Sequence, residues 1–160
     1  MGKIERDFIG YSNNYPKFSW PNNSKIAIQF VLNYEEGAEN CVLNGDQASE
    51  SFLSEIIGAL PYKDARHMSM ESIYEYGSRA GVWRVLNLFK NNKLPITIFA
   101  VANALKSNQK FCDQVLKDNH EICSHGLKWI NYHGISEDVE RSHMQEAIEI
   151  QKSICGYRPL

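Results

Sequence analysis

Two acidic residues and a histidine stand directly after two runs of sequence that have the composition of buried strands. Glu35 and Glu36 follow the apolar run at residues 25–33, and His125 follows the short run at residues 121–124. In parallel α/β folds the reactive groups lie at the carboxyl ends of the strands. Two carboxyl groups and an imidazole at one rim could activate water for hydrolysis. We therefore predict that the Glu35 carboxylate and the His125 ring lie within reach of each other.

Each of these positions also has a structural interpretation, which spacing alone leaves open. Two adjacent glutamates after a strand often form a solvated turn, and a single histidine after a short strand often has a packing role. The other histidines are expected to be surface or packing residues: His67, His120, His133 and His143. The catalytic interpretation of Glu35, Glu36 and His125 therefore depends on their meeting at one rim.

The histidine spacing differs from that of a catalytic zinc site, which needs about three protein ligands and an open position. His120 and His125 are five residues apart, so within one strand their side chains would point to opposite faces. The residue four places after His125 is Trp129 and not a second histidine. The spacing of the four cysteines matches no zinc-binding pattern. We expect no metal and no other cofactor, and a divalent metal such as zinc is the alternative.

The elements that must position these residues follow the order strand, helix, strand, helix, strand, helix. Apolar, β-branched runs indicate three buried strands: residues 25–33, 96–101 and 121–124. Apolar residues at three- and four-residue spacing indicate three helices: residues 78–92, residues 107–118 and the stretch between Ser136 and Gly156. Ser136 suits the N-cap of the last helix and Gly156 its C-terminal stop. This alternation predicts an α/β fold with a parallel sheet.

Two parts of the chain depart from this pattern. Residues 1–24 lack periodicity but are rich in aromatic side chains, so we expect an arm that packs on the body or on a neighbouring subunit. Residues 25–160 form the body. Within it, residues 34–76 are polar and weakly patterned, and a loop of that length in a compact domain is usually functional or disordered.

Composition and charge exclude several classes of function. The chain has 160 residues with 17 basic and 19 acidic side chains, a net charge of −2. Because no basic patch stands out, we expect no nucleic-acid partner. The N-terminus is too charged for a secretory signal, and no apolar run approaches the roughly 20 residues of a membrane helix. We therefore expect a cytoplasmic protein without a membrane partner.

Three segments, in the same order, resemble the allantoinase-like subgroup of the polysaccharide deacetylase superfamily. They are LNYEEGAEN at residues 32–40, MESIYEYGSRAGVWR at residues 70–84 and HEICSHGLKWI at residues 120–130. The resemblance implies a distorted (β/α) barrel with parallel strands and flanking helices, of which this chain carries the N-terminal part. It also implies hydrolysis of carbon–nitrogen bonds other than peptide bonds.

The resemblance assigns roles to individual residues. Metal-dependent members carry two adjacent aspartates and a His-x-x-x-His pair, whereas this sequence has Glu35 and Glu36, then His125 and Trp129. That departure matches the allantoinase-like subgroup, thought to act without a metal in opening the allantoin ring to allantoate. It implies Glu35 as general base, Glu36 as its electrostatic partner and His125 as proton donor or shuttle.

Further residues are expected to contact the substrate. Arg79 would hydrogen-bond ureido carbonyl groups, and Tyr76 and Trp129 would line the pocket. Arg79 could equally be a surface helix residue, and Tyr76 a packing aromatic. We expect Arg79 to share one concave face with Glu35, Glu36 and His125.

Two other functions stay open. One is a metal-dependent deacetylase of acetylated sugars, so the substrate would be either a ureide or an acetylated sugar. The other is a non-catalytic remnant or interaction module of a split gene. Because the later barrel strands are missing, we expect the chain alone to be inactive. We also expect a homo-oligomer or a second chain that completes the barrel.

Overall fold

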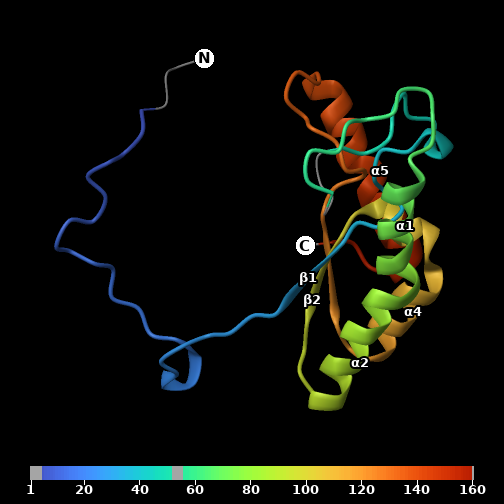
Figure 1. Ribbon diagram of the computed structural model, residues 1–160. Coiled ribbons are helices and arrows are strands. Elements are labelled where there is room, and N and C mark those ends of the chain that lie inside the picture. Colours follow the sequence, from blue (N-terminus) through green and yellow to red (C-terminus); the bar gives the residue numbers. More distant parts are fainter. Residues whose placement is uncertain (1–4, 52–55, 160) are drawn as a thin grey trace.

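The computed structural model describes residues 5–51 and 56–159, and its body is a parallel sheet with helices (Figure 1). The three strands are β1 (Val31–Tyr34), β2 (Thr97–Ala100) and β3 (Glu121–Ser124), in the spatial order β1-β2-β3. Both pairings are parallel, and the register places Leu32 beside Ile98 and Ile98 beside Ile122. The predicted α/β fold with a parallel sheet is confirmed.

The helices α1, α2 and α4 lie on one side of the strands (Figure 1). The longer helices are α1 (Met68–Tyr76), α2 (Val82–Asn92), α4 (Gln109–Lys117) and α5 (Glu137–Cys155). The shorter turns are η1 (Pro21–Asn23), η2 (Val42–Asn44), the π-helical η3 (Gly77–Gly81) and α3 (Ala102–Ser107). None of the helices described is long and apolar enough to cross a membrane.

Predicted helix ends are found where local capping chemistry is strong. The Ser136 hydroxyl accepts a hydrogen bond from the N–H of Val139 at the start of α5, as expected of an N-cap. Gly156 ends the same helix with a φ of 79°, a left-handed conformation that favours glycine. The Ser136 hydroxyl and the left-handed backbone of Gly156 therefore mark the two ends of α5.

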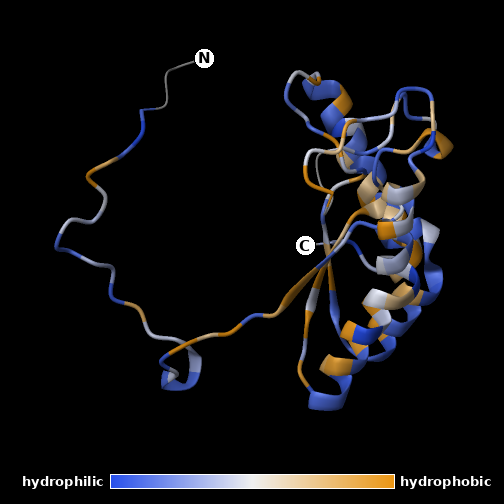
Figure 2. Ribbon diagram, viewed as in Figure 1, coloured by the Kyte–Doolittle hydropathy of each residue, from blue (hydrophilic) through white to orange (hydrophobic). Residues whose placement is uncertain are grey.

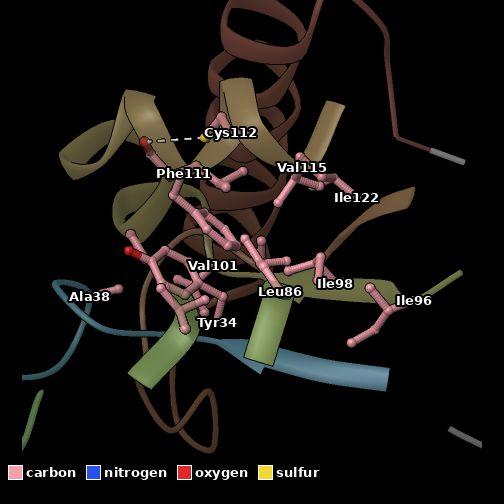
Figure 3. Close-up of a cluster of buried hydrophobic side chains, with 14 residues drawn as sticks. Tyr34, Ala38, Leu86, Ile96, Ile98, Val101, Phe111, Cys112, Val115 and Ile122 are labelled. Atoms are coloured by element: carbon pink, nitrogen blue, oxygen red, sulfur yellow. Dashed lines mark hydrogen bonds between the residues drawn. The ribbon is translucent and has the colours of Figure 1, made fainter. Parts of the chain in front are cut away.

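The core lies between the sheet and its helical cover (Figure 3). Ile98 of β2 and Phe111 and Val115 of α4 are fully buried. The rings of Tyr34 and Phe111 stack with centroids 3.9 Å apart, so the last residue of β1 is anchored directly on α4. Burial of each such side chain is worth about 1.5–3 kcal/mol. This packing fixes the position of the strand end from which Glu35 leaves the sheet.

The first strand is shorter than the sequence pattern predicts. We expected a strand covered on both faces over residues 25–33, but β1 begins at Val31, and Ile26 and Ile28 are 68% and 71% exposed. The reason is the register: Val31 pairs with Thr97, the first residue of β2, so the residues before it have no described neighbouring strand. A β-branched run forms a strand only where a partner meets it.

Two helices lie where the sequence pattern showed none. Helix α1 (Met68–Tyr76) occupies the end of the segment expected to be a loop, and α3 (Ala102–Ser107) follows β2 directly. Met70 of α1 is 2% exposed, so this helix is held by burial against the body and not by a strong apolar stripe of its own. Tertiary packing routinely overrides weak local propensity in this way.

An extended arm leaves the body at the start of β1 (Figure 1). Every residue from 5 to 31 is exposed, and hydrophobic stretches alternate with polar ones along this course (Figure 2). The exposed course thus continues beyond residue 24, where the sequence analysis divides arm from body. That division and the arm's packing stay predictions.

Candidate active site

The carboxyl ends of β1 and β3 bring Glu35 and His125 together across β2. Tyr34, Ala100 and Ser124 are in register, so the residues that follow β1 and β3 leave the sheet at the same edge. The Oε1 atom of Glu35 lies 3.3 Å from Nε2 of His125. The predicted meeting of these two side chains is therefore confirmed as geometry, and their catalytic roles stay predictions.

Main-chain hydrogen bonds hold the segment that carries His125. The N–H of His125 donates to the carbonyl of Ala100 at 3.0 Å. Gly126 follows with a φ of 83°, which only glycine adopts without steric cost. The N–H of Ala102, the first residue of α3, donates to the Gly126 carbonyl at 2.9 Å and so gains a partner that a helix N-terminus otherwise lacks. The turn after β3 therefore has a defined course.

The Glu35 carboxyl group keeps its proton more readily than an exposed glutamate does. Burial raises the pKa of Glu35 above its ordinary value of 4.5, nearby His125 opposes the rise, and Glu36 adds to it. Neither Oε1 of Glu35 nor Nε2 of His125 completes a hydrogen bond within the described part of the chain. A carboxylate with a raised pKa and an oxygen not already bonded has the properties of a general base for water.

A hydrogen bond from the backbone holds the Glu36 carboxylate, and the lack of a side chain on Gly77 leaves room for it. Its Oε2 atom accepts a hydrogen bond from the N–H of Glu35 at 3.1 Å. Its Oε1 atom lies 2.3 Å from the point that a Cβ atom on Gly77 would occupy. Gly77 opens η3, and π-helical turns of this kind occur often at functional sites. Sequence reasoning missed Gly77, although a glycine inside a helical pattern was an available signal.

Two further carboxyl groups lie nearby that the sequence analysis did not single out. Glu39 is buried and accepts a hydrogen bond from the N–H of Gly37 at 2.6 Å, and burial raises its pKa. Glu50 is 2% exposed and accepts from the N–H of Asn40 at 3.1 Å. Burial raises the pKa of Tyr74, and the charges of Glu50 and Glu39 raise it further. Glu39 belongs to the acidic motif after β1, whereas Glu50 had no sequence signal.

A hollow of about 710 Å³ opens beside His125. Trp129 forms part of its wall, with its ring centroid 5.4 Å from that of His125. The N–H of Trp129 donates to the carbonyl of Ala38 at 3.1 Å, which ties this loop to the segment after β1. Asn40 and Asn131 line the same hollow. It therefore offers an aromatic wall and amide groups beside the His125 ring.

Arg79 and Tyr76 lie away from this hollow. Arg79 lines a second hollow, of about 510 Å³, that Glu36 also lines, and its guanidinium pairs with Glu75 at 2.9 Å. The Tyr76 side chain is exposed and lines neither hollow. The expected convergence on one concave face is therefore not seen for Arg79 and His125, because η3 carries Arg79 into a hollow walled by helices. Their roles in substrate binding stay predictions.

The residues that could hold a metal were tested for fit. A catalytic zinc site needs about three protein ligands. Within residues 5–51 and 56–159, no three side chains of histidine, cysteine, aspartate or glutamate gather closely enough to hold a metal ion. Glu36 and His125 could supply two ligands, and Trp129 stands where a third is expected. The described part of the chain alone does not fit a zinc site.

Comparison with known sequences decides the family. Residues 63–160, more than half of the chain, match the family profile described as polysaccharide deacetylase. The chain belongs to the polysaccharide deacetylase family. A Schizosaccharomyces pombe protein named as a polysaccharide deacetylase is 44% identical over 137 residues, which are 84% of this chain and 42% of that protein. The predicted superfamily is thus confirmed.

Two solved structures of this family share the fold closely. A probable polysaccharide deacetylase from Pseudomonas aeruginosa PAO1 is 56% identical, with a TM-score of 0.92 over 98% of this chain and 52% of that one. The PuuE allantoinase is 52% identical, with a TM-score of 0.93 over 99% of this chain and 53% of that one. The chain thus spans about half the length of these relatives, and its three parallel strands and helices match about half of their distorted barrel.

Proposed function

We propose that this chain supplies part of the active site of an allantoinase-like hydrolase, which opens the ring of a cyclic ureide. Two kinds of relative support different substrates, since one solved structure is named for allantoin and the other for polysaccharide. The observation that carries the choice is Trp129. Its indole packs beside His125 at the position where metal-dependent deacetylases have their second histidine.

Water activation is the first step of the proposed reaction. Water attacks the carbonyl carbon of the ring amide while the Glu35 carboxylate accepts one of its protons. Glu36 supports this base, because its Oε2 atom accepts the Glu35 N–H and places a second negative charge beside it. The negative charge that develops on the carbonyl oxygen needs a donor, and the Asn131 amide group that lines the hollow is suited to this role.

Ring opening is the second step. The carbon–nitrogen bond breaks, and the leaving nitrogen takes the proton that Glu35 received. His125 lies 3.3 Å from Glu35 and can pass this proton onward, which is the role of a shuttle. The product carries a new carboxyl group and a free ureido nitrogen, so one water has been added and no oxidant is needed.

A metal-dependent deacetylase of acetylated sugars is the second candidate. The family match and the Schizosaccharomyces pombe and Pseudomonas aeruginosa relatives favour it by name. It requires metal ligands beyond Glu36 and His125. Elemental analysis of protein purified without chelator separates the two candidates: near one equivalent of zinc, cobalt or iron favours the deacetylase.

Ligand binding tests the proposed substrate without requiring turnover. In ¹⁵N-labelled protein, allantoin is expected to shift the indole signal of Trp129 and the ring signals of His125 in a saturable way. Trp129→Ala is expected to weaken this binding at least tenfold. Trp20→Ala is the matched control, because Trp20 lies on the exposed arm and should leave the affinity unchanged.

The opposite pattern would reject the ureide assignment. It consists of no saturable effect of allantoin at millimolar concentration, together with binding of an N-acetylglucosamine oligomer that depends on added zinc. A Glu35→Gln variant completes the test, since it keeps the shape of the site but removes the proposed base. It should bind allantoin about as tightly as the parent chain.

A further inference from the structure

Asn40 and Glu50 are hydrogen-bonded to each other in the wall of the hollow beside His125. The Oε2 atom of Glu50 accepts two hydrogen bonds from Asn40, one from its main-chain N–H at 3.1 Å and one from Nδ2 at 2.9 Å. The N–H of Ser51 donates to the other oxygen of Glu50, Oε1, at 2.9 Å. Glu50 is only 2% exposed. A buried carboxylate therefore holds both the main chain and the side chain of Asn40 at the edge of the candidate site.

This contact decides which end of the Asn40 carboxamide is left for a ligand. An ionised carboxylate only accepts hydrogen bonds, so the amide nitrogen and not the carbonyl oxygen must face Glu50. The opposite orientation would bring two acceptors together beside a buried charge. Within residues 5–51 and 56–159, no donor is hydrogen-bonded to the Oδ1 atom of Asn40. This carbonyl oxygen is therefore an oriented acceptor on a residue that lines the hollow.

The loop that carries this acceptor is tied to the segment after β3, which forms another wall of the hollow. The N–H of Trp129 donates to the carbonyl of Ala38 at 3.1 Å. Asp46 accepts a hydrogen bond from the N–H of Cys41 at 2.9 Å and pairs with the ammonium group of Lys128. Lys128 and Trp129 both line the hollow. Because these groups are held in place before a ligand arrives, less ordering is needed on binding.

We propose that Asn40 is a specificity-determining residue, whose carbonyl oxygen accepts a hydrogen bond from an N–H group of the substrate ring. Glu50 is its positioning residue. This inference rests on the proposed function, because a cyclic ureide carries ring N–H groups beside its carbonyl groups. A site built to hydrogen-bond an N–H group rejects an analogue that lacks it, since the acceptor is then left unpaired. The pair thus selects ureides whose ring nitrogens are unsubstituted.

Two cyclic ureides isolate the proposed hydrogen bond. Hydantoin has ring N–H groups, whereas 1,3-dimethylhydantoin keeps the ring and its carbonyl groups but has no N–H. In titrations of ¹⁵N-labelled protein, the parent chain should bind hydantoin about tenfold more tightly than the dimethyl compound. In Asn40→Ala this ratio of affinities should fall by about fivefold. Asn44→Ala is the matched control and should leave the ratio unchanged, because Asn44 is exposed and lines neither hollow.

Variants at Glu50 test the orientation of the acceptor separately from its presence. The side chain introduced by Glu50→Gln can donate or accept, so it no longer fixes the Asn40 carboxamide, and the ratio should fall. The double variant Asn40→Asp/Glu50→Gln restores a hydrogen bond of reversed polarity and keeps an acceptor oxygen at position 40. It should therefore recover the preference for hydantoin. A merely structural role of Glu50 would instead weaken the binding of both compounds and leave their ratio unchanged.

The outcomes separate this inference from the proposed function. If hydantoin and allantoin bind but the ratio is the same in Asn40→Ala as in the parent, the role of Asn40 is refuted and the proposed function stands. If the double variant binds both compounds without recovering the preference, the positioning role of Glu50 is refuted. If no cyclic ureide binds to the parent chain, the inference and the proposed function fall together.

Discussion

Gly77 and Glu36 form a contact whose importance can be measured directly. A Cβ atom on Gly77 would lie 2.3 Å from Oε1 of Glu36 and 2.9 Å from its Cδ and Cγ atoms. Contacts this short are not tolerated, so Gly77→Ala must displace the whole carboxylate and not only its tip. The displaced group loses the hydrogen bond from the N–H of Glu35.

Two opposing effects set the magnitude for Gly77→Ala. Alanine favours a helical position over glycine by about 1 kcal/mol. Loss of a hydrogen bond to a charged group costs about 1.5–3 kcal/mol. The free energy of unfolding should therefore fall by about 0.5–2 kcal/mol in Gly77→Ala.

Gly81→Ala is the matched control, because it lies at the other end of the same turn. A Cβ atom there would meet Tyr76 at 3.6 Å, an ordinary van der Waals contact. This variant should be neutral or stabilised by up to about 1 kcal/mol. Urea unfolding of both variants measures the difference.

A double-mutant cycle isolates the contact from helix propensity. In a Glu36→Ala background the carboxylate is absent, so Gly77→Ala should no longer destabilise the chain and should behave like Gly81→Ala. If Gly77→Ala alone proves as stable as Gly81→Ala, or if its cost persists in Glu36→Ala, the inferred clash is wrong.

Three further predictions follow from the pKa of Glu35, the core and the extent of the sheet. Because the pKa of Glu35 is raised in the folded state, its ionisation destabilises the fold as the pH rises from about 4.5 through the raised value. Glu35→Gln should therefore be more stable than the parent at neutral pH, and this gain in stability should shrink toward pH 4. A gain in stability that grows on acidification would contradict the direction of the pKa shift. Phe111→Ala should lower the free energy of unfolding by about 3–5 kcal/mol, because Phe111 is fully buried and stacked on Tyr34. Phe8→Ala on the exposed arm should change the free energy of unfolding by no more than about 0.5 kcal/mol. Equal effects of the two variants in urea unfolding would show that the assigned core is wrong. The chain alone should not turn over allantoin, because barrel enzymes draw catalytic groups from several strand ends and only three strands are described here; robust hydrolysis by the purified chain would refute this expectation.

The acidic surroundings of Glu35 affect how each of these variants is designed. Glu36, Glu39 and Glu50 all raise the pKa of Tyr74, which shows that the carboxyl groups act on a common region. Glu36 also raises the pKa of Glu35 and that of Glu39, so replacement of Glu36 should lower both pKa values. Single variants in this cluster need a pH profile, because one measurement at neutral pH combines the loss of the replaced side chain with the change in the pKa values of its neighbours.

Local sequence was sufficient for elements whose ends depend on local chemistry. The expected strand at residues 121–124 coincides with β3, and Ser136 and Gly156 bound α5 as expected. Side-chain capping and a left-handed glycine act within a few residues, so their effects are visible in a single sequence. The order of strands and helices in turn placed Glu35 and His125 at one edge of a parallel sheet.

The tertiary structure decided whatever depends on partners distant in sequence. The start of β1 at Val31 depends on its pairing with Thr97, which no local pattern of residues 25–33 can show. Glu50 and Gly77 reach the site through packing across the fold, and the η3 turn carries Arg79 into a different hollow from His125. Periodicity reports which residues prefer burial, but only the folded chain specifies which side chains then meet.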